Sequence, residues 1–166
     1  MFFKAFEALD KKFHFERASA NCDIPCGIYD PSAAQIAALT VVRMVDLMAD
    51  LEAKGSEKDR AYTNSMSRYV AVKEEHAEKA KHEIRIIWGD YIKAQHIEKY
   101  PQLHDLVHKI MQFGSKSRQT ADREAAVQFV EAINQFSEIF WDTKGVKTKR
   151  AKAPFNPPLE MVYTDL

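Results

Sequence analysis

This 166-residue sequence predicts an all-α fold, an antiparallel four-helix bundle. Three observations support this prediction. Apolar residues recur with a helical period in four segments, short polar joins separate these segments, and no segment alternates with period two for long enough to form a strand. A chain of this length forms one domain that can bury a sizeable core. The few glycines and prolines, five and six, also suit a helical protein.

The first two predicted helices follow from their end signals and their apolar stripes. Asp30-Pro31 predicts a helix start, because Asp caps free backbone amides and Pro fits the first helical position. Lys54-Gly55 ends this helix, with Gly suited to a left-handed cap. A longer helix is expected from about 59 to 91. Its bundle-facing positions repeat every seven residues and are Val70, Ala77, Ile84 and Tyr91.

Two further helices complete the predicted bundle. A loop through His96 leads to the third helix, which opens at Tyr100-Pro101 and closes at Gly114. The polar stretch SKSRQ is expected to be a loop. The fourth helix begins near Thr120 and ends at Lys144-Gly145. Short joins of this kind favour antiparallel neighbours.

The C-terminal tail, residues 146–166, is basic at first and then rich in proline. Proline prevents a continuous helix there, so we expect an extended segment that packs on a neighbour or stays loose. A disordered end is equally compatible with the sequence. The basic residues of the tail are expected to be solvated, with contact to an anionic partner as the alternative; they are Lys147, Lys149, Arg150 and Lys152.

Charge and composition exclude several classes of protein. Lysine plus arginine and aspartate plus glutamate both number 24, and this balance argues against a nucleic-acid partner. No uninterrupted apolar run of about 18 residues occurs, so we expect no membrane partner. We also expect a cytoplasmic location. Two cysteines do not make a disulfide framework. They indicate reduced thiols, a metal site or redox chemistry instead.

The first twenty residues are predicted to be a removable leader, and the domain is expected to span 21–166. Phenylalanines alternate with charged residues there, and the stretch ends in the small residues Ala18-Ser19-Ala20, which resemble a cleavage signature. The charges interrupt any apolar core that a secretory signal would need. The alternative is that this stretch forms a first helix of the mature fold.

Both cysteines lie in a segment built to bend, residues 21–29, which we call the hook. Pro25 and Gly27 disfavour a helix around Cys22 and Cys26. Thiolates bind soft metals, but two ligands rarely hold an ion. Cleavage after Ala20 would free an amine, and this amine and the next backbone amide could complete a planar N2S2 set for nickel(II) or copper(II). Two incidental cysteines remain the alternative.

Three segments together resemble the nickel-containing superoxide dismutases. CDIPCGIYDP at 22–31 resembles the nickel hook of that family, and WGDYIKAQHIEKYPQLHDLV at 88–107 and IFWDTKG at 139–145 resemble later family segments in the same order. The resemblance implies a four-helix-bundle subunit, a homohexamer and a protease that removes the leader. It also implies a nickel ion that alternates between two oxidation states while superoxide becomes oxygen and hydrogen peroxide.

The resemblance further implies roles for individual residues. Two thiolates, one backbone amide and the new amine would bind nickel, two tyrosines would shape the opening above the metal, and an aspartate would hold the loop. The residues are Asn21, Cys22 and Cys26 as metal ligands, and Tyr29, Tyr91 and Asp23 as catalytic residues.

One residue departs from the family pattern. The family begins its mature chain with a histidine, the axial ligand of oxidised nickel, whereas this chain has Asn21. In some members a carboxylate holds that histidine, and the matching position is Ala37; His76 could occupy related space. We therefore predict that nickel binds and that dismutation is slowed. The alternatives are a non-catalytic helical assembly protein that retains the hook, and a thiol redox protein that uses Cys22 and Cys26.

Overall fold

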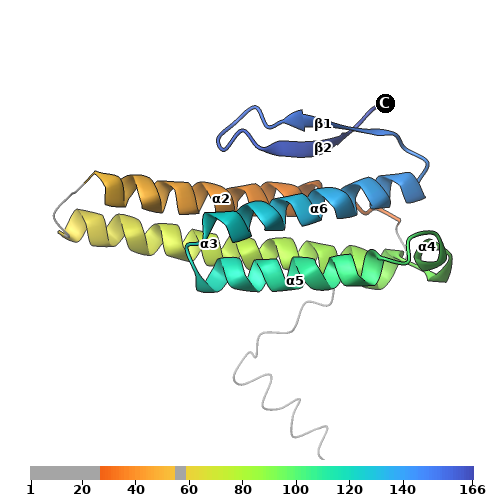
Figure 1. The fold of residues 1–166 in the computed structure, drawn as a ribbon, viewed down its shortest axis with the longest axis horizontal. Coiled ribbons are helices and arrows are strands. Elements are labelled where there is room, and N and C mark those ends of the chain that lie inside the picture. Colours follow the sequence, from red (N-terminus) through yellow and green to blue (C-terminus); the bar gives the residue numbers. More distant parts are fainter. Residues whose placement is uncertain (1–26, 55–58) are drawn as a thin grey trace, which may run out of the picture.

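The structure, a computed structural model, describes residues 27–54 and 59–166. The predicted leader and hook residues 21–26 lie outside this part of the chain. Four long helices lie side by side (Figure 1), namely α2 (Ser32–Ala53), α3 (Arg60–Ile86), α5 (Leu103–Gln119) and α6 (Arg123–Thr143). The helical bundle predicted from the sequence is therefore confirmed.

The core lies where the four helices meet. Helix α2 contacts α3 and α6, and α5 contacts α3 and α6, so each helix has two packed neighbours. Both α2 and α3 contribute small alanines to the core, including Ala37, Ala38 and Ala77, all at most 1% exposed. Large side chains fill the rest of the core; the fully buried ones include Ile84, Leu103, Ile110, Phe129, Ile133, Phe136 and Phe140.

Helix α2 is the one described helix that is long and apolar enough, by length and composition alone, to cross a membrane. Half of its most apolar stretch is buried inside the molecule, which is also what a core helix of a bundle shows.

Predicted helix ends are confirmed where a side chain or a glycine fixes them. The Asp30 carboxylate accepts a hydrogen bond from the Ser32 amide at 2.7 Å, at the predicted start of α2. Asp59 accepts from the Tyr62 amide at 2.8 Å and so caps α3. Gly145 follows α6 with φ +70°, the left-handed conformation that favours glycine.

Two predicted loops are wrong. The stretch after Gly114 is helical, because α5 continues to Gln119. Gly114 is buried in the bundle, where a Cβ would lie 2.7 Å from Cγ and Cδ of Lys81 and 3.0 Å from Cζ of Phe129. The glycine therefore permits close packing and does not end the helix. The second predicted loop, through His96, is a short helix, α4 (Ala94–Lys99). There Nδ1 of His96 accepts a hydrogen bond from the backbone N–H of Lys93 at 3.1 Å.

A buried lysine marks the true end of α5. The Lys73 ammonium of α3 donates to the carbonyl oxygens of Ser117, Arg118 and Thr120 at 2.6, 2.6 and 2.8 Å. These carbonyls lack partners within the helix, so the lysine satisfies them. Burial holds the pKa of Lys73 below its ordinary value.

Replacing Gly114 with alanine is expected to destabilise the protein. The added methyl group overlaps the Lys81 stem and the Phe129 ring, so the free energy of unfolding should fall by about 1–3 kcal/mol despite the better helix propensity of alanine. Urea denaturation measures the change. Gly89→Ala is the matched control, because a Cβ at Gly89 meets nothing within 4 Å. Equal stability of the two variants would contradict this account of Gly114.

The tail forms a β-hairpin on the bundle. Strands β1 (Thr148–Lys152) and β2 (Glu160–Thr164) are antiparallel, with Arg150 opposite Val162. The hairpin lies along α2 and α6, with β2 on the side of the helices (Figure 1). The expectation of an extended tail is confirmed, whereas the expectation that the chain has no strand is wrong. Charged residues with little alternation hide these strands from a periodicity analysis.

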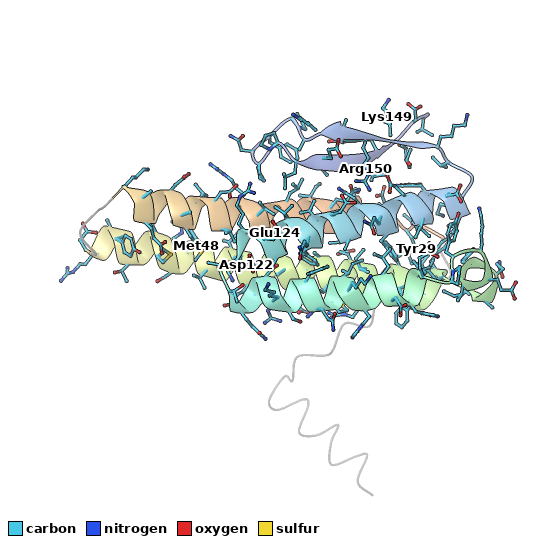
Figure 2. All side chains as sticks on the ribbon, viewed as in Figure 1. Tyr29, Met48, Asp122, Glu124, Lys149 and Arg150 are labelled. Atoms are coloured by element: carbon cyan, nitrogen blue, oxygen red, sulfur yellow. The ribbon has the colours of Figure 1, made fainter. Side chains whose placement is uncertain are left out.

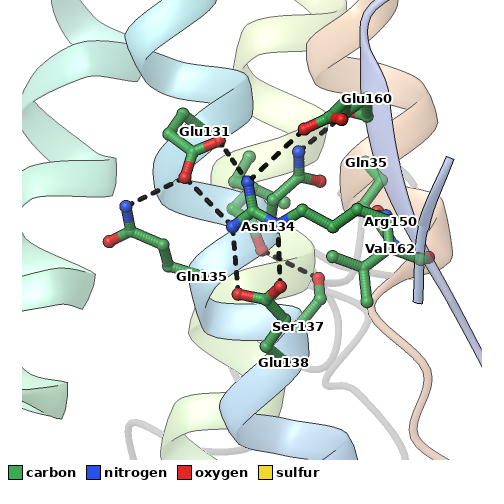
Figure 3. A network of polar contacts seen from close by, with 10 residues as sticks. Gln35, Glu131, Asn134, Gln135, Ser137, Glu138, Arg150, Glu160 and Val162 are labelled. Carbon is green, nitrogen blue, oxygen red and sulfur yellow. Dashed lines mark hydrogen bonds and ion pairs between the residues drawn. The ribbon is translucent and has the colours of Figure 1, made fainter. Parts of the chain in front are cut away.

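The expectation that Arg150 is solvated is wrong, because two carboxylates hold its guanidinium. Its guanidinium binds Glu138 through Nε and Nη2 at 2.7 and 3.0 Å, and Glu131 through Nη1 and Nη2 at 2.8 and 3.0 Å (Figure 3). Both carboxylates belong to α6. The two forked ion pairs tie β1 to the bundle.

Acid should weaken the attachment of the hairpin. Partial burial raises the pKa of Glu131, but hydrogen bonds from Arg150 and Gln135 outweigh burial, so its pKa lies below the usual value. A carboxylate with a depressed pKa contributes stability above its unfolded pKa and loses it as pH falls through the folded pKa. Thermal unfolding from pH 6 to pH 3 should therefore show a fall in Tm that is smaller in Arg150→Met. Parallel falls in both proteins would rule out this source of acid sensitivity.

Candidate functional site

Two tyrosines meet beside the hook. Tyr29 is the last hook residue, and its ring lies 5.6 Å from the ring of Tyr91, with 45° between the planes. Figure 2 shows Tyr29 at the end of the bundle that carries α4. Gly27 has φ +71°, so the described end of the hook contains the bend expected from the sequence. The structure thus brings together the two predicted residues that it describes.

An unusual helical turn supplies Tyr91. Helix α3 continues as a π-helix, η1 (Ile87–Tyr91), closed by a bond from the Ile92 amide to the Ile87 carbonyl at 3.2 Å. Such turns are rare and are frequent at functional sites. The predicted helix to residue 91 is confirmed in extent, although its last turn is wider than an α-turn.

The hydroxyl of Tyr91 is fixed by the end of α6. It lies 2.8 Å from Oγ1 of Thr143, and this oxygen is 2.6 Å from the carbonyl oxygen of Phe140. The Thr143 hydroxyl uses its one hydrogen for that carbonyl, so Tyr91 is the donor in the other bond. The ring of Tyr91 is therefore oriented with its proton committed to Thr143.

Side chains that the sequence analysis did not assign surround the Tyr91 ring. His96 stacks on it with ring centres 5.2 Å apart and 20° between the planes, and Phe140 meets it edge-on at 5.1 Å. The Lys144 ammonium lies 4.7 Å from the centre of the Tyr91 ring, within cation–π range. All three lie in the segments 88–107 and 139–145, which is the only sequence signal that pointed to them.

Two further positions named in the sequence analysis are Ala37 and His76. Ala37 is 1% exposed in the core, so this position holds no carboxylate near the hook. His76 lies half-buried on α3, with its Nδ1 2.9 Å from the Val72 carbonyl of the preceding turn. That contact gives His76 a partner within its own helix.

The metal ligands predicted from the sequence, Asn21, Cys22 and Cys26, lie outside the described residues, as does Asp23. Within residues 27–54 and 59–166, no group of three or more His, Cys, Asp or Glu could hold a metal ion. The donor chemistry of residues 21–26 fits nickel, because thiolates are soft ligands and nitrogen donors suit a planar site. The hook therefore remains the candidate metal centre.

Comparisons with known proteins agree on one family. The family model described as nickel-containing superoxide dismutase matches residues 16–144. The chain is 38% identical over 126 residues to "Superoxide dismutase [Ni]" of Streptomyces coelicolor, covering 76% of this chain and 89% of that protein. It is 36% identical over 128 residues to the protein of the same name from Streptomyces seoulensis, covering 77% and 91%.

Solved structures give the same result. A native nickel superoxide dismutase superposes with a TM-score of 0.65 at 36% identity, covering 75% of this chain and 99% of that chain. A histidine-to-alanine mutant of such an enzyme gives a TM-score of 0.62 at 34% identity, covering 70% and 99%. With the family model across most of its length and these relatives in agreement, the chain belongs to the nickel-containing superoxide dismutase family.

Proposed function

We propose that the processed chain, beginning at Asn21, converts superoxide to oxygen and hydrogen peroxide at a nickel ion. Cys22 and Cys26 would supply thiolates, and the backbone nitrogens of residues 21 and 22 would complete the ligand set. The observation that carries the proposal is the Tyr29–Tyr91 pair, 5.6 Å apart and directly after the hook, in a chain of this family. Nickel when bound would supply one-electron redox chemistry by alternating between Ni(II) and Ni(III).

The described residues favour access by a small anion. The Lys144 ammonium over the Tyr91 ring places positive charge at the tyrosine pair, and positive charge in an opening raises the arrival rate of anions. Because Tyr91 donates its proton to Thr143, its role is to shape the opening. Tyr29 forms the other wall, and Asp23 is proposed to hold the loop.

Asn21 is the basis for a slowed reaction. Its side-chain amide is a weaker donor for oxidised nickel than an imidazole, so the higher oxidation state gains less stabilisation. Ala37 adds no carboxylate that could orient a ligand from position 21. Nickel binding itself depends on the sulfurs and backbone nitrogens, which the substitution leaves in place.

Maturation, assembly and location extend the proposal. Removal of residues 1–20 by a protease is required, because the amine of Asn21 is otherwise held in a peptide bond. The family resemblance supports a homohexamer, and a cytoplasmic location is part of the same proposal. Family membership does not favour the two alternatives, a non-catalytic assembly protein or a thiol redox protein.

Mass spectrometry of the N-terminus, combined with nickel content, tests the proposal. A chain that begins at Asn21 should bind one nickel per chain under reducing conditions and should dismutate superoxide, whereas Cys26→Ser should do neither. A processed chain that stays empty when offered nickel would refute the proposed function. A reversible Cys22–Cys26 disulfide in that empty protein would favour the thiol redox alternative.

A further inference from the structure

The inner edge of the hairpin is completed by two buried amides. Val162 of β2 donates its backbone N–H to Oε1 of Gln35 at 2.8 Å and accepts from Nε2 of the same residue at 3.2 Å. The carbonyl of Glu160 accepts from Nδ2 of Asn134 at 2.8 Å. Alternate residues of a strand direct their backbone groups to the same edge, so Gln35 of α2 and Asn134 of α6 replace a third strand.

These contacts are built into the core. Gln35 is 2% exposed and Asn134 is 1% exposed, and a buried amide without partners would be costly. Arg150 adds its forked ion pairs to Glu131 and Glu138 from the other strand (Figure 3). The hairpin is therefore attached both to the first turns of α2 and to α6.

Both attachments lie close to the tyrosine pair in the chain. The backbone N–H of Gln35 donates to the Pro31 carbonyl at 3.1 Å, so Gln35 lies one helical turn after the buried Pro31. Tyr29 precedes Pro31 by two residues. At the other end, α6 ends at Thr143, which holds Tyr91, and a short connection leads from there to β1 at Thr148. A connection between α2 and the hairpin thus links the segments that carry the two rings.

A cavity lies where these segments converge. Its volume is about 350 Å³, and its walls come from the start of α2, the end of α6 and β2, including Asp30, Ser32, Trp141, Val146, Tyr163 and Thr164. Because open space separates part of these walls, the spacing between them depends on the hairpin contacts as well as on direct packing.

We propose that the C-terminal hairpin is a positioning element for the Tyr29–Tyr91 pair. Through Gln35 it fixes the first turn of α2 against the end of α6, and so sets the place of Tyr29 relative to Tyr91. The matched family region ends at residue 144, before β1 begins, so the hairpin lies outside the part that the chain shares with the family model, whereas Gln35 lies inside it. Its effect on nickel rests on the proposed function, whereas its effect on the backbone does not.

Gln35→Met in the full processed chain is the test, because methionine keeps the length of the side chain and removes both hydrogen bonds. Hydrogen exchange of the metal-free protein should speed up in residues 160–164 and also in residues 32–36 at the start of α2, by about ten- to thirty-fold for two ordinary hydrogen bonds. Nickel affinity, measured by competition with a chelator, should fall about ten-fold. Gln128→Met, an exposed glutamine on α6, is the control and should change neither quantity.

The outcomes separate the two proposals. Faster exchange in residues 160–164 with unchanged exchange in residues 32–36 would overturn the positioning role. If the unaltered chain binds no nickel, the proposed function fails, and the exchange of residues 32–36 alone decides the role of the hairpin. Arg150→Met loosens the hairpin without touching α2 and should give the same pattern, which keeps the test decisive if Gln35→Met does not fold.

Discussion

Asn21→His is expected to raise the superoxide dismutation rate of the processed protein by about 100-fold, because residues that only support metal ligands already change activity by about 10- to 100-fold. An imidazole at residue 21 can bind oxidised nickel, whereas the asparagine amide is a poor donor. Pulse radiolysis or a stopped-flow assay measures the rate per bound nickel, so that differences in metal loading do not enter the comparison. The electron paramagnetic resonance spectrum should also change, because a new nitrogen ligand couples to the unpaired electron.

Asn21→Ala serves as the control for this substitution. It keeps the free amine, the Cys22 amide and both thiolates, so nickel content should equal that of the unaltered protein. Its rate should also match, because the asparagine side chain is expected to contribute little. If Asn21→His is no faster than Asn21→Ala, the missing axial ligand does not limit this enzyme.

Phe140→Ala is expected to lower the free energy of unfolding by about 3–5 kcal/mol, the usual range for removing a fully buried aromatic ring. Phe140 is 0% exposed, and its ring meets Tyr91 at 5.1 Å and Trp141 at 5.0 Å. The cavity would therefore open directly beneath the Tyr91 ring. Guanidinium denaturation gives the free energy, and tyrosine fluorescence reports whether the site loosens before the bundle unfolds.

Phe155→Ala is the matched control, because Phe155 lies in the loop that connects β1 to β2 and is 49% exposed. Its effect should stay within about 0.5 kcal/mol, as for most exposed substitutions. A loss below about 1 kcal/mol in Phe140→Ala would mean that the neighbouring side chains close the space, and that Phe140 does not support Tyr91.

The bundle could be predicted from the sequence because the signals for each helix lie within or next to that helix in the chain. Apolar residues repeat within each helix, and Asp30 and Gly145 mark ends through their own backbone chemistry. Gly114 misled the analysis because the same residue type ends helices and permits close packing, and only the neighbouring Lys81 and Phe129 distinguish the two uses. Such neighbours are distant in sequence.

The candidate site also combines local and distant information. Tyr29 and Tyr91 were expected at the site from the motifs around them, and the structure places their rings 5.6 Å apart. The partners that hold Tyr91, such as Thr143 and Lys144, depend on how the end of α6 meets the π-helix. Gln35 also escaped notice, because a glutamine near a helix start is usually exposed, and only the hairpin 127 residues later explains its burial.

The π-helix makes segment length a part of this site. A wide turn holds one residue more than an α-turn, and each residue rotates the chain by about 100° around the helix axis. Deleting a single residue from Ile87–Tyr91 would therefore swing the ring of Tyr91 away from Tyr29, even with every remaining amino acid unchanged. Insertions and deletions in these five residues should be tolerated far less well than point substitutions at exposed Gly89.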